Sequence, residues 1–204
     1  MNLSTIAREI RVCTRCNLYK GRQRTVPGEG PSWARVMLVG EAPGREEDIH
    51  GRPFVGRSGR LLDEILKKAG LERDDLFITS VVKCRPPKNR VPRKWEWETC
   101  IQAHLRRQID VIDPTIICLL GGIATKALLG KDRLSEGRGR MFRRERRVFF
   151  PTYHPAGAGR NRSWYRTFSK DIVRLHSLAQ SKQYDPSITI RMQRNARGRG
   201  DPEI

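Results

Sequence analysis

The chain has 204 residues, with 41 Lys and Arg against 22 Asp and Glu, which gives a formal net charge of +19. This length suffices for one sizeable domain with a hydrophobic core, and so basic a balance favours a polyanionic partner, most often nucleic acid, over a Lys/Arg-rich surface that merely aids solubility. No apolar run approaches the roughly twenty residues of a membrane span, and the N-terminus lacks a signal-peptide core, so we expect a cytoplasmic, nucleoid-associated protein with no membrane partner.

The predicted elements alternate between helix and strand along the chain. Apolar spacing predicts a short helix over 3–12, and glycines and prolines predict a loop over 19–33. Strands are predicted at 35–39, 76–82, 115–120 and 147–150, and helices at 58–69, 96–112, 123–129 and 164–181. This order predicts a three-layer α/β/α sandwich around a mostly parallel four-stranded sheet. The domain is expected to cover 1–182, followed by a basic, flexible tail over 183–204 that would bind phosphates if it binds anything.

An acidic turn after the first predicted strand indicates a site. The apolar strand ends at Gly40, and four acids follow within a strongly basic chain: Glu41, Glu46, Glu47 and Asp48. In parallel α/β sheets, sites form beyond the carboxyl ends of the strands. The alternative, which applies best to Glu46 and Asp48, is an acidic first turn favoured by the dipole of the following helix.

The five cysteines divide into two groups. Cys118 lies inside an apolar strand and is assigned to the core, where a free thiol behaves as a small hydrophobe. Cys13 and Cys16 form a C-x2-C pair, and Cys84 and Cys100 follow far downstream in polar surroundings. In a reducing compartment a disulfide framework is not expected. The spacing leaves open a structural zinc ion, an iron–sulfur cluster, or four unconnected thiols.

Several motifs in a fixed order carry a family resemblance. The chain contains C-x2-C, GEAPGREED, GRPFVGRSGRLLD, ITSVVKCRPPKNR and YHPA, in that order. This set resembles the family 4 uracil-DNA glycosylases, the iron–sulfur members of their superfamily, over about residues 10–178. The resemblance implies that the cofactor is a [4Fe-4S] cluster, structural in role, on Cys13, Cys16, Cys84 and Cys100. It also implies a monofunctional hydrolase that cuts the N-glycosidic bond of uracil flipped out of DNA and leaves an abasic site.

Such a reaction requires a stacking ring, a donor to the departing base and a group that positions water near the sugar. Phe54 is the predicted ring, although it could be an ordinary core residue under its loop. His154 is the predicted donor to the base oxygen, with a purely structural histidine as the alternative. Glu41 is the first choice for the water or the sugar cation, and the backbone of Gly40 and Ala42 is expected to contact the base. Better-known superfamily members carry Asp where this chain has Ala42.

The remaining expected site residues are Glu47, Ser80, Arg160 and Arg162. Glu47 is the second acidic catalytic residue and is expected to guard the pocket. Ser80 stands where the family pattern carries the Asn that reads the uracil edge, so the range of accepted bases is expected to be broader or altered. Arg160 and Arg162 are expected to contact DNA phosphates or fill the gap left by the flipped base, the alternative being a solvated basic loop.

Two other functions stay open on the sequence. One is a glycosylase for another deaminated base, such as hypoxanthine, because of Ser80. The other is a non-enzymatic iron–sulfur DNA-binding module with an accessory role in replication. The combination of Glu41, Phe54 and His154 favours an enzyme, since phosphate binding needs none of them. The expected partner is uracil-containing DNA, single- or double-stranded, bound by a monomer, with a sliding clamp as a further partner.

Overall fold

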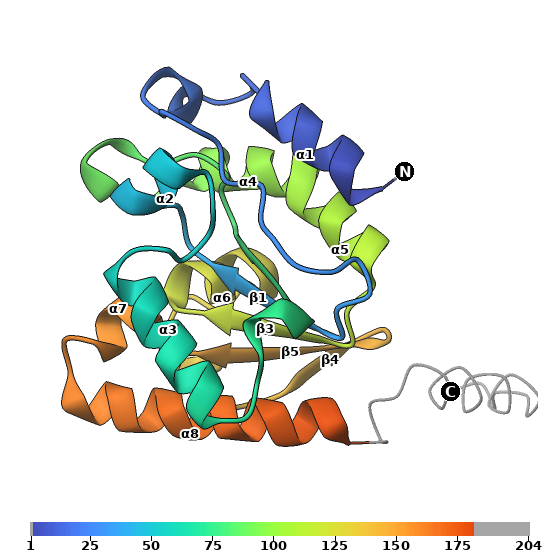
Figure 1. Cartoon of the computed structure of the whole chain (residues 1–204), viewed down its shortest axis with the longest axis vertical. Coiled ribbons are helices and arrows are strands. Elements are labelled where there is room, and N and C mark those ends of the chain that lie inside the picture. The colour runs from blue at the N-terminus through green and yellow to red at the C-terminus, as the bar shows by residue number, and fades with distance from the viewer. Residues whose placement is uncertain (1, 182–204) are drawn as a thin grey trace, which may run out of the picture.

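The computed structural model describes residues 2–181. Its centre is a sheet of five strands in the order β2-β1-β3-β5-β4 (Figure 1). The strands are β1 (Val36–Gly40), β2 (Leu76–Ser80), β3 (Ile116–Leu120), β4 (Phe142–Arg144) and β5 (Arg147–Thr152). The first four strands in the spatial order run parallel, and β4 joins the edge antiparallel to β5. The predicted α/β class with a mostly parallel sheet is confirmed.

The central strands β1 and β3 are apolar and buried along their whole length because both faces of the sheet are covered. Successive side chains of a strand point to opposite faces. In β1, Val36 and Leu38 therefore belong to one hydrophobic core, whereas Met37 and Val39 belong to the other. Cys118 is fully buried in β3, as its apolar context predicts.

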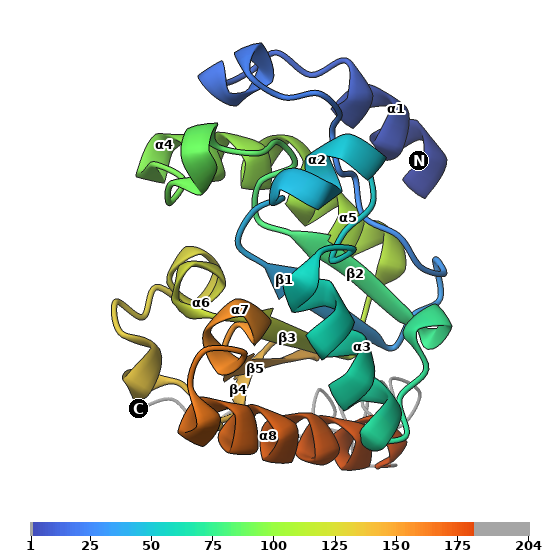
Figure 2. The same cartoon turned by 60° about the vertical axis from the view of Figure 1, so that its left-hand side comes forward.

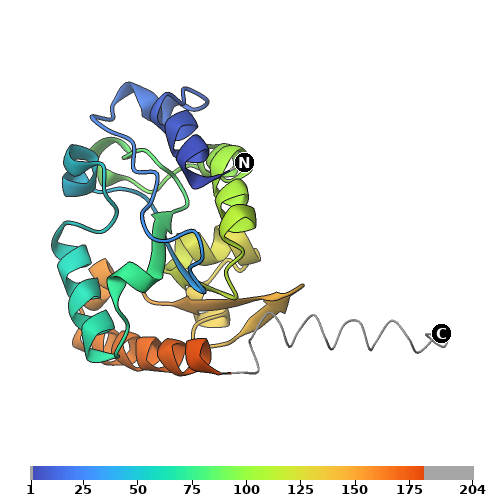
Figure 3. The ribbon, with the colours of Figure 1, turned by 45° about the vertical axis from the view of Figure 1, so that its right-hand side comes forward.

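Helices cover each face of the sheet. They are α1 (Leu3–Arg11), α2 (Arg45–His50), α3 (Arg57–Lys68), α4 (Lys94–Cys100), α5 (Arg106–Ile112), α6 (Gly122–Leu129), α7 (Pro155–Ala158) and α8 (Arg162–Gln180). Apolar residues of α3, α7 and α8 pack on one face, and those of α5 and α6 pack on the other (Figure 2). The N-terminal helix α1 lies against α5 (Figures 1 and 3). The sheet is thus the middle layer of a three-layer sandwich.

The predicted count of four strands is wrong. Phe142–Arg144 forms the additional strand β4, paired with β5 through a tight turn in which Glu145 has a φ of 52°. Arg143 and Arg144 are exposed, so this three-residue edge strand carries almost no apolar pattern. A short, charged edge strand also discourages pairing with other chains.

The predicted helix over 96–112 is present, but a π-helical turn divides it into two α-helices. Helix α4 ends at Cys100, the turn spans Ile101–Leu105, and α5 follows directly. Such π-turns are rare and often mark functional sites. No helix among residues 2–181 is long and apolar enough to cross a membrane. The predicted basic tail, residues 183–204, lies outside the described residues.

Candidate active site and cysteine cavity

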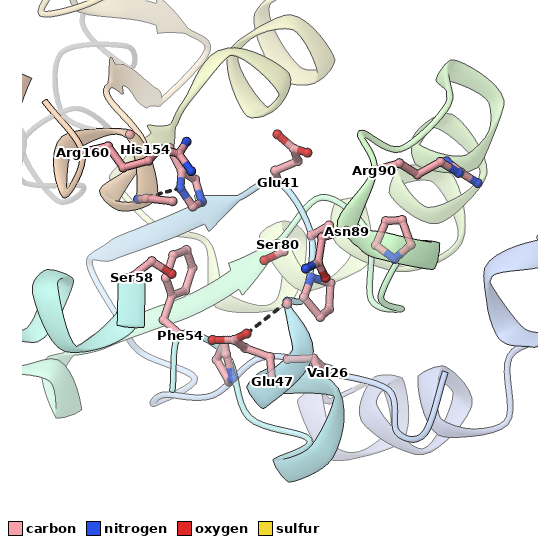
Figure 4. A pocket seen from close by; sticks show the side chains of 17 residues that line it. Val26, Glu41, Glu47, Phe54, Ser58, Ser80, Asn89, Arg90, His154 and Arg160 are labelled. Atoms are coloured by element: carbon pink, nitrogen blue, oxygen red, sulfur yellow. Dashed lines mark hydrogen bonds between the residues drawn. The ribbon is translucent and has the colours of Figure 1, made fainter. Parts of the chain in front are cut away.

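A cavity of about 470 Å³ opens at the carboxyl ends of β1, β2 and β5 (Figure 4). Most of the residues predicted to touch the base or sugar line this cavity: Glu41, Ala42, Glu47, Phe54, Ser80, His154 and Arg160. Gly40, the last residue of β1, lies directly beneath the Phe54 ring. Gly40 and Ser80 are also paired in the sheet register, so the two strands end side by side at the floor of the cavity.

The Phe54 ring packs flat against the end of β1. A Cβ atom on Gly40 would lie 2.6 Å from Phe54 Cζ and 3.2 Å from Ser80 Oγ, so only glycine leaves room for the ring. The ring centroid of Phe54 is 5.7 Å from that of His154, with an angle of 32° between the rings. Phe54 is only 6% exposed, yet it lines the cavity. Phe54 therefore contributes both to the core and to one wall of the cavity.

The backbone of Phe54 is held in an unusual conformation. Its φ is 52°, in the left-handed region that residues with a Cβ rarely adopt. Gly59 in α3 packs directly on this backbone, because a Cβ there would lie 1.8 Å from the Phe54 carbonyl oxygen. Gly59 therefore allows α3 to pack closely on the Phe54 backbone. Strain of this kind persists where the surroundings fix it, commonly at functional sites.

Glu47 fixes the same loop through its carboxylate. Oε1 accepts hydrogen bonds from the backbone N–H groups of Val55 and Gly56, both at 2.9 Å, and Oε2 accepts one from Gly44 N at 3.0 Å. Glu47 is 8% exposed and lies at the rim of the cavity. Its carboxylate thus joins the start of α2 to the segment immediately after Phe54.

His154 follows β5 and caps α7. Its Nδ1 accepts a hydrogen bond from Ala156 N at 3.1 Å, which requires that the proton of the neutral ring be on Nε2. Burial, with a smaller contribution from the positive charge of Arg160, lowers the pKa of His154 to about 4. At neutral pH the ring is therefore uncharged and offers an Nε2–H donor at the edge of the cavity.

Glu41 is the carboxylate of the cavity that has no partner within residues 2–181. It is half-buried, and burial raises its pKa above the usual value. In Figure 4 its side chain lies between His154 and Arg90 at the mouth of the cavity. Ala42 beside it contributes only a methyl group. An uncompensated carboxylate at this position can accept a proton from water or face a developing cation.

The two predicted DNA-binding arginines differ in position. Arg160 is exposed and lines the cavity next to His154. Arg162 is exposed as the first residue of α8 and is not among the residues that line the cavity. Arg160 lies on the segment that joins α7 to α8, two residues before Arg162. Arg160 is therefore a cavity residue, whereas Arg162 is a surface residue.

The sequence reasoning missed three polar residues of the cavity, Ser58, Asn89 and Arg90. Asn89 has a φ of 55° and accepts a hydrogen bond at Oδ1 from Arg85 Nε at 2.7 Å. Arg90 forms a double hydrogen bond with the buried carboxylate of Glu96, at 2.6 and 2.8 Å. Asn89 and Arg90 follow Pro86 and Pro87, and nothing in the local pattern indicates that this segment folds over the end of β2.

A second, smaller cavity brings the four predicted ligand cysteines together. Cys13, Cys16, Cys84 and Cys100 all line it, together with Arg22, Lys83 and His104. Arg22 Nη1 donates to Cys84 Sγ at 3.2 Å and to the Cys13 carbonyl oxygen at 2.7 Å. Among residues 2–181, no three His, Cys, Asp or Glu side chains are grouped tightly enough to hold a single metal ion.

Burial disfavours the ionised form of the thiols in this cavity. It raises the pKa values of Cys16 and Cys84, and that of Cys100 to about 12, and a bound metal centre would offset this cost by stabilising the thiolates. His104 is 3% exposed, and neither of its ring nitrogens has a hydrogen-bond partner. A buried, unpaired imidazole in the wall of the cavity is expected where a bound group supplies the missing partner.

Comparisons with known proteins identify the family of the chain. The family model described as Uracil DNA glycosylase superfamily matches residues 27–175. A type-4 uracil-DNA glycosylase of Sulfurisphaera tokodaii is 43% identical over 188 residues, covering 87% of this chain and 85% of that protein. One from Saccharolobus solfataricus is 42% identical over 191 residues, covering 89% and 88%. One from Pyrobaculum aerophilum is 40% identical over 198 residues, covering 92% and 100%.

Proposed function

The chain belongs to the uracil DNA glycosylase superfamily and, within it, to the type-4 uracil-DNA glycosylases, and from this membership we propose that it excises uracil from DNA. The reaction is hydrolysis of the N-glycosidic bond, which leaves an abasic site for repair. The observation that carries the proposal is the cavity at the strand ends, where Phe54, His154 and Glu41 converge. A duplex base must be flipped out of the stack to enter it.

Phe54 and His154 act on the departing base. The Phe54 ring stacks on the flipped uracil and holds its plane against the end of β1. As the bond to the sugar breaks, negative charge develops on the base oxygen. The neutral His154 donates its Nε2–H to that oxygen, because Nδ1 is engaged by Ala156 N. Preorganised donors aimed at developing charge lower the barrier without reorganisation.

Glu41 acts on the sugar side of the bond. The departing base leaves a sugar with the character of an oxocarbenium cation, and a carboxylate nearby stabilises it and orients the attacking water. The raised pKa of Glu41 and its lack of a partner among the described residues support this role. Glu47 is a positioning residue, since its three backbone hydrogen bonds hold the loop that bears Phe54. Gly40 and Ala42 contribute backbone contacts to the base.

Ser80 supports a second candidate substrate, another deaminated base such as hypoxanthine. An amide at this position would offer a donor and an acceptor in fixed geometry, whereas the serine hydroxyl offers one rotatable group. Ser80 is 4% exposed and lines the floor of the cavity, so the base edge must face it. Reading the base with a hydroxyl relaxes the discrimination between similar edges.

We also propose that Cys13, Cys16, Cys84 and Cys100 hold a [4Fe-4S] cluster. Four thiols around one cavity, without a tight three-ligand group among residues 2–181, favour a multi-iron centre over a single zinc ion. When bound, the cluster would tie the segment after α1, which carries Cys13 and Cys16, to Cys84 in the loop after β2 and to Cys100 at the end of α4. Hydrolysis transfers no electron, so this role is structural.

DNA is the expected partner of the basic surface. Arg160 at the cavity and Arg162 at the start of α8 contact phosphates on either side of the flipped nucleotide. A protein that acts on chromosomal DNA is expected to work at the nucleoid. Action as a monomer and contact with a sliding clamp stay predictions.

One assay tests the proposal. Purified protein is incubated with oligonucleotides that carry a single uracil, a single hypoxanthine or no lesion, and alkali then cuts any abasic site. We expect cleavage at uracil, and a loss of at least tenfold in single-turnover rate for His154→Gln. The matched control is His50→Gln, because His50 is exposed on α2 and lies outside the cavity. Absence of cleavage at both modified bases would refute the enzymatic function.

A further inference from the structure

Lys83 lies between the base cavity and the cysteine cavity. Its side chain is 1% exposed, which is rare for a lysine. Nζ donates hydrogen bonds to Thr79 Oγ1 at 2.5 Å and to the Ser80 carbonyl oxygen at 2.8 Å. Ser80 lines the base cavity, whereas Lys83 itself lines the cysteine cavity. The side chain therefore reaches from one site to the backbone of the other.

The backbone of Lys83 makes the same connection. Its N–H is hydrogen-bonded to the sulfur of Cys100, and its carbonyl oxygen accepts a hydrogen bond from Val26 N at 2.8 Å. Cys100 lines the cysteine cavity, and Val26 lines the base cavity. Thr79 Oγ1 in turn donates to the Pro27 carbonyl oxygen at 3.1 Å. One residue thus has direct hydrogen bonds to the walls of both cavities.

The charge of Lys83 has no carboxylate partner among residues 2–181. A buried ammonium ion is costly unless an opposite charge lies near it. Cys84 and Cys100, two of the proposed cluster ligands, line the same cavity as Lys83, and as cluster ligands they would be thiolates. Four thiolates with a [4Fe-4S] core carry a net negative charge. The cluster is therefore the countercharge that the burial of Lys83 requires.

We propose that Lys83 is a positioning residue that couples the iron–sulfur cluster to base recognition: it balances the charge of the cluster and holds Ser80 in the orientation that reads the base. This inference rests on the proposed cluster and on the proposed uracil excision. Reduction makes the cluster more negative, so a nearby positive charge favours the reduced form. Loss of the ammonium group also removes the hydrogen bond to the Ser80 carbonyl oxygen. Ser80 is then held less firmly, which weakens binding of the base more than it slows cleavage of the glycosidic bond.

The test compares Lys83→Met with wild type in two measurements. The first is the reduction potential of the cluster, followed by its visible absorption. We expect the reduction potential of Lys83→Met to be more negative by at least about 59 mV, which for one electron is a tenfold change in the equilibrium constant of reduction. The second measurement determines KM and kcat on a uracil-containing oligonucleotide. We expect KM to rise at least fivefold and kcat to change by a smaller factor. Lys68→Met is the matched control, since Lys68 is an exposed lysine of α3.

The outcomes separate this inference from the proposed function. An unchanged potential would overturn the role as countercharge, and a shifted potential with an unchanged KM would overturn the coupling. If Lys83→Met does not fold, Thr79→Val decides, because it keeps the ammonium group but removes its hydrogen bond to Thr79, the neighbour of Ser80 in β2. That variant should retain its iron and raise KM at least threefold; an unchanged KM overturns the coupling. A wild type without a cluster or without excision would overturn the proposed function and this inference with it.

Discussion

Replacing Gly40 with alanine tests whether the Phe54 ring contacts the substrate base. The new Cβ would lie 2.6 Å from Phe54 Cζ and 3.0 Å from Cε2. An ordinary carbon–carbon contact is about 3.6 Å, so the ring must move by about 1 Å. Gly59 and the left-handed backbone keep Phe54 itself in place, so the movement takes the form of a ring tilt into the cavity.

The Gly40→Ala substitution should lower both the free energy of unfolding and the rate of catalysis. Overpacking of this kind destabilises a protein by about 1–3 kcal/mol. A misplacement of about 1 Å in a positioning group lowers catalysis by about 100-fold, which corresponds to about 2.7 kcal/mol in the barrier. Gly40→Ala should therefore remain folded at room temperature yet lose about 100-fold in the single-turnover rate on uracil-containing DNA.

Urea unfolding and single-turnover excision measure the two effects separately. The matched control is Gly122→Ala, at the start of α6, where a Cβ would meet nothing within 4 Å. That change should leave activity as it is and stability equal or slightly raised, since alanine favours a helix over glycine by about 1 kcal/mol. A Gly40→Ala variant that is destabilised but fully active would show that Phe54 is a core residue only, which is the alternative that the sequence left open.

Four further variants test the other roles. Glu47→Gln keeps the hydrogen bonds to the loop but places an amide NH₂ group against Gly44 N–H. Urea unfolding should therefore show that the free energy of unfolding falls by about 1.5–3 kcal/mol. An unchanged unfolding midpoint contradicts the role of Glu47 in holding the loop. The pKa of His154 is about 4 in the fold against 6.5 as its ordinary value, so the stability it contributes is complete above about pH 6.5 and is lost as the pH falls towards 4. Unfolding at about pH 7 and 4.5 should therefore show a larger acid-induced loss for wild type than for His154→Gln, and equal losses would refute a neutral ring. Cys13→Ala should abolish the visible absorption of the cluster while Cys118→Ala retains it; retention in both argues against the ligand set. Ser80→Asn should improve discrimination of uracil from hypoxanthine by about 1–3 kcal/mol in single-turnover rates, by analogy with base-edge readout, and equal or poorer discrimination counts against Ser80 as the reader.

The sequence predicted the sandwich and the place of the site because both follow from short-range patterns. Apolar runs with a period of two or of 3.6 residues define strands and helices, and the ends of parallel strands meet at one edge. His154, Ser80 and Glu41 could therefore be brought together without coordinates. The family resemblance implied that Cys84 and Cys13 share a site, but the residue pattern alone could not bring them together, because no local pattern relates the segment after β2 to the segment after α1.

The contacts that hold the site were beyond the sequence for a physical reason. The hydrogen bonds of Glu47 go to backbone N–H groups, which every residue except proline has, so no pattern of side chains reveals them. Lys83 reads as a surface lysine in a basic segment, and only the packing shows that it is buried. The edge strand β4 was missed because its arginines face solvent and carry no apolar alternation.

The acidic turn after β1 can now be divided by what each carboxylate contacts. Glu47 holds the Phe54 loop, and Asp48 accepts hydrogen bonds from the backbone N–H groups of Gln23 at 2.9 Å and Arg24 at 3.3 Å. Glu46 is exposed in the first turn of α2, where the helix dipole favours an acid. Glu41 alone of the four is half-buried in the cavity without a partner among the described residues. A carboxylate kept partly dehydrated and unpaired raises the free energy of the resting site, and a cationic transition state beside it recovers that cost, which is why Glu41 is the acid expected to act on the sugar.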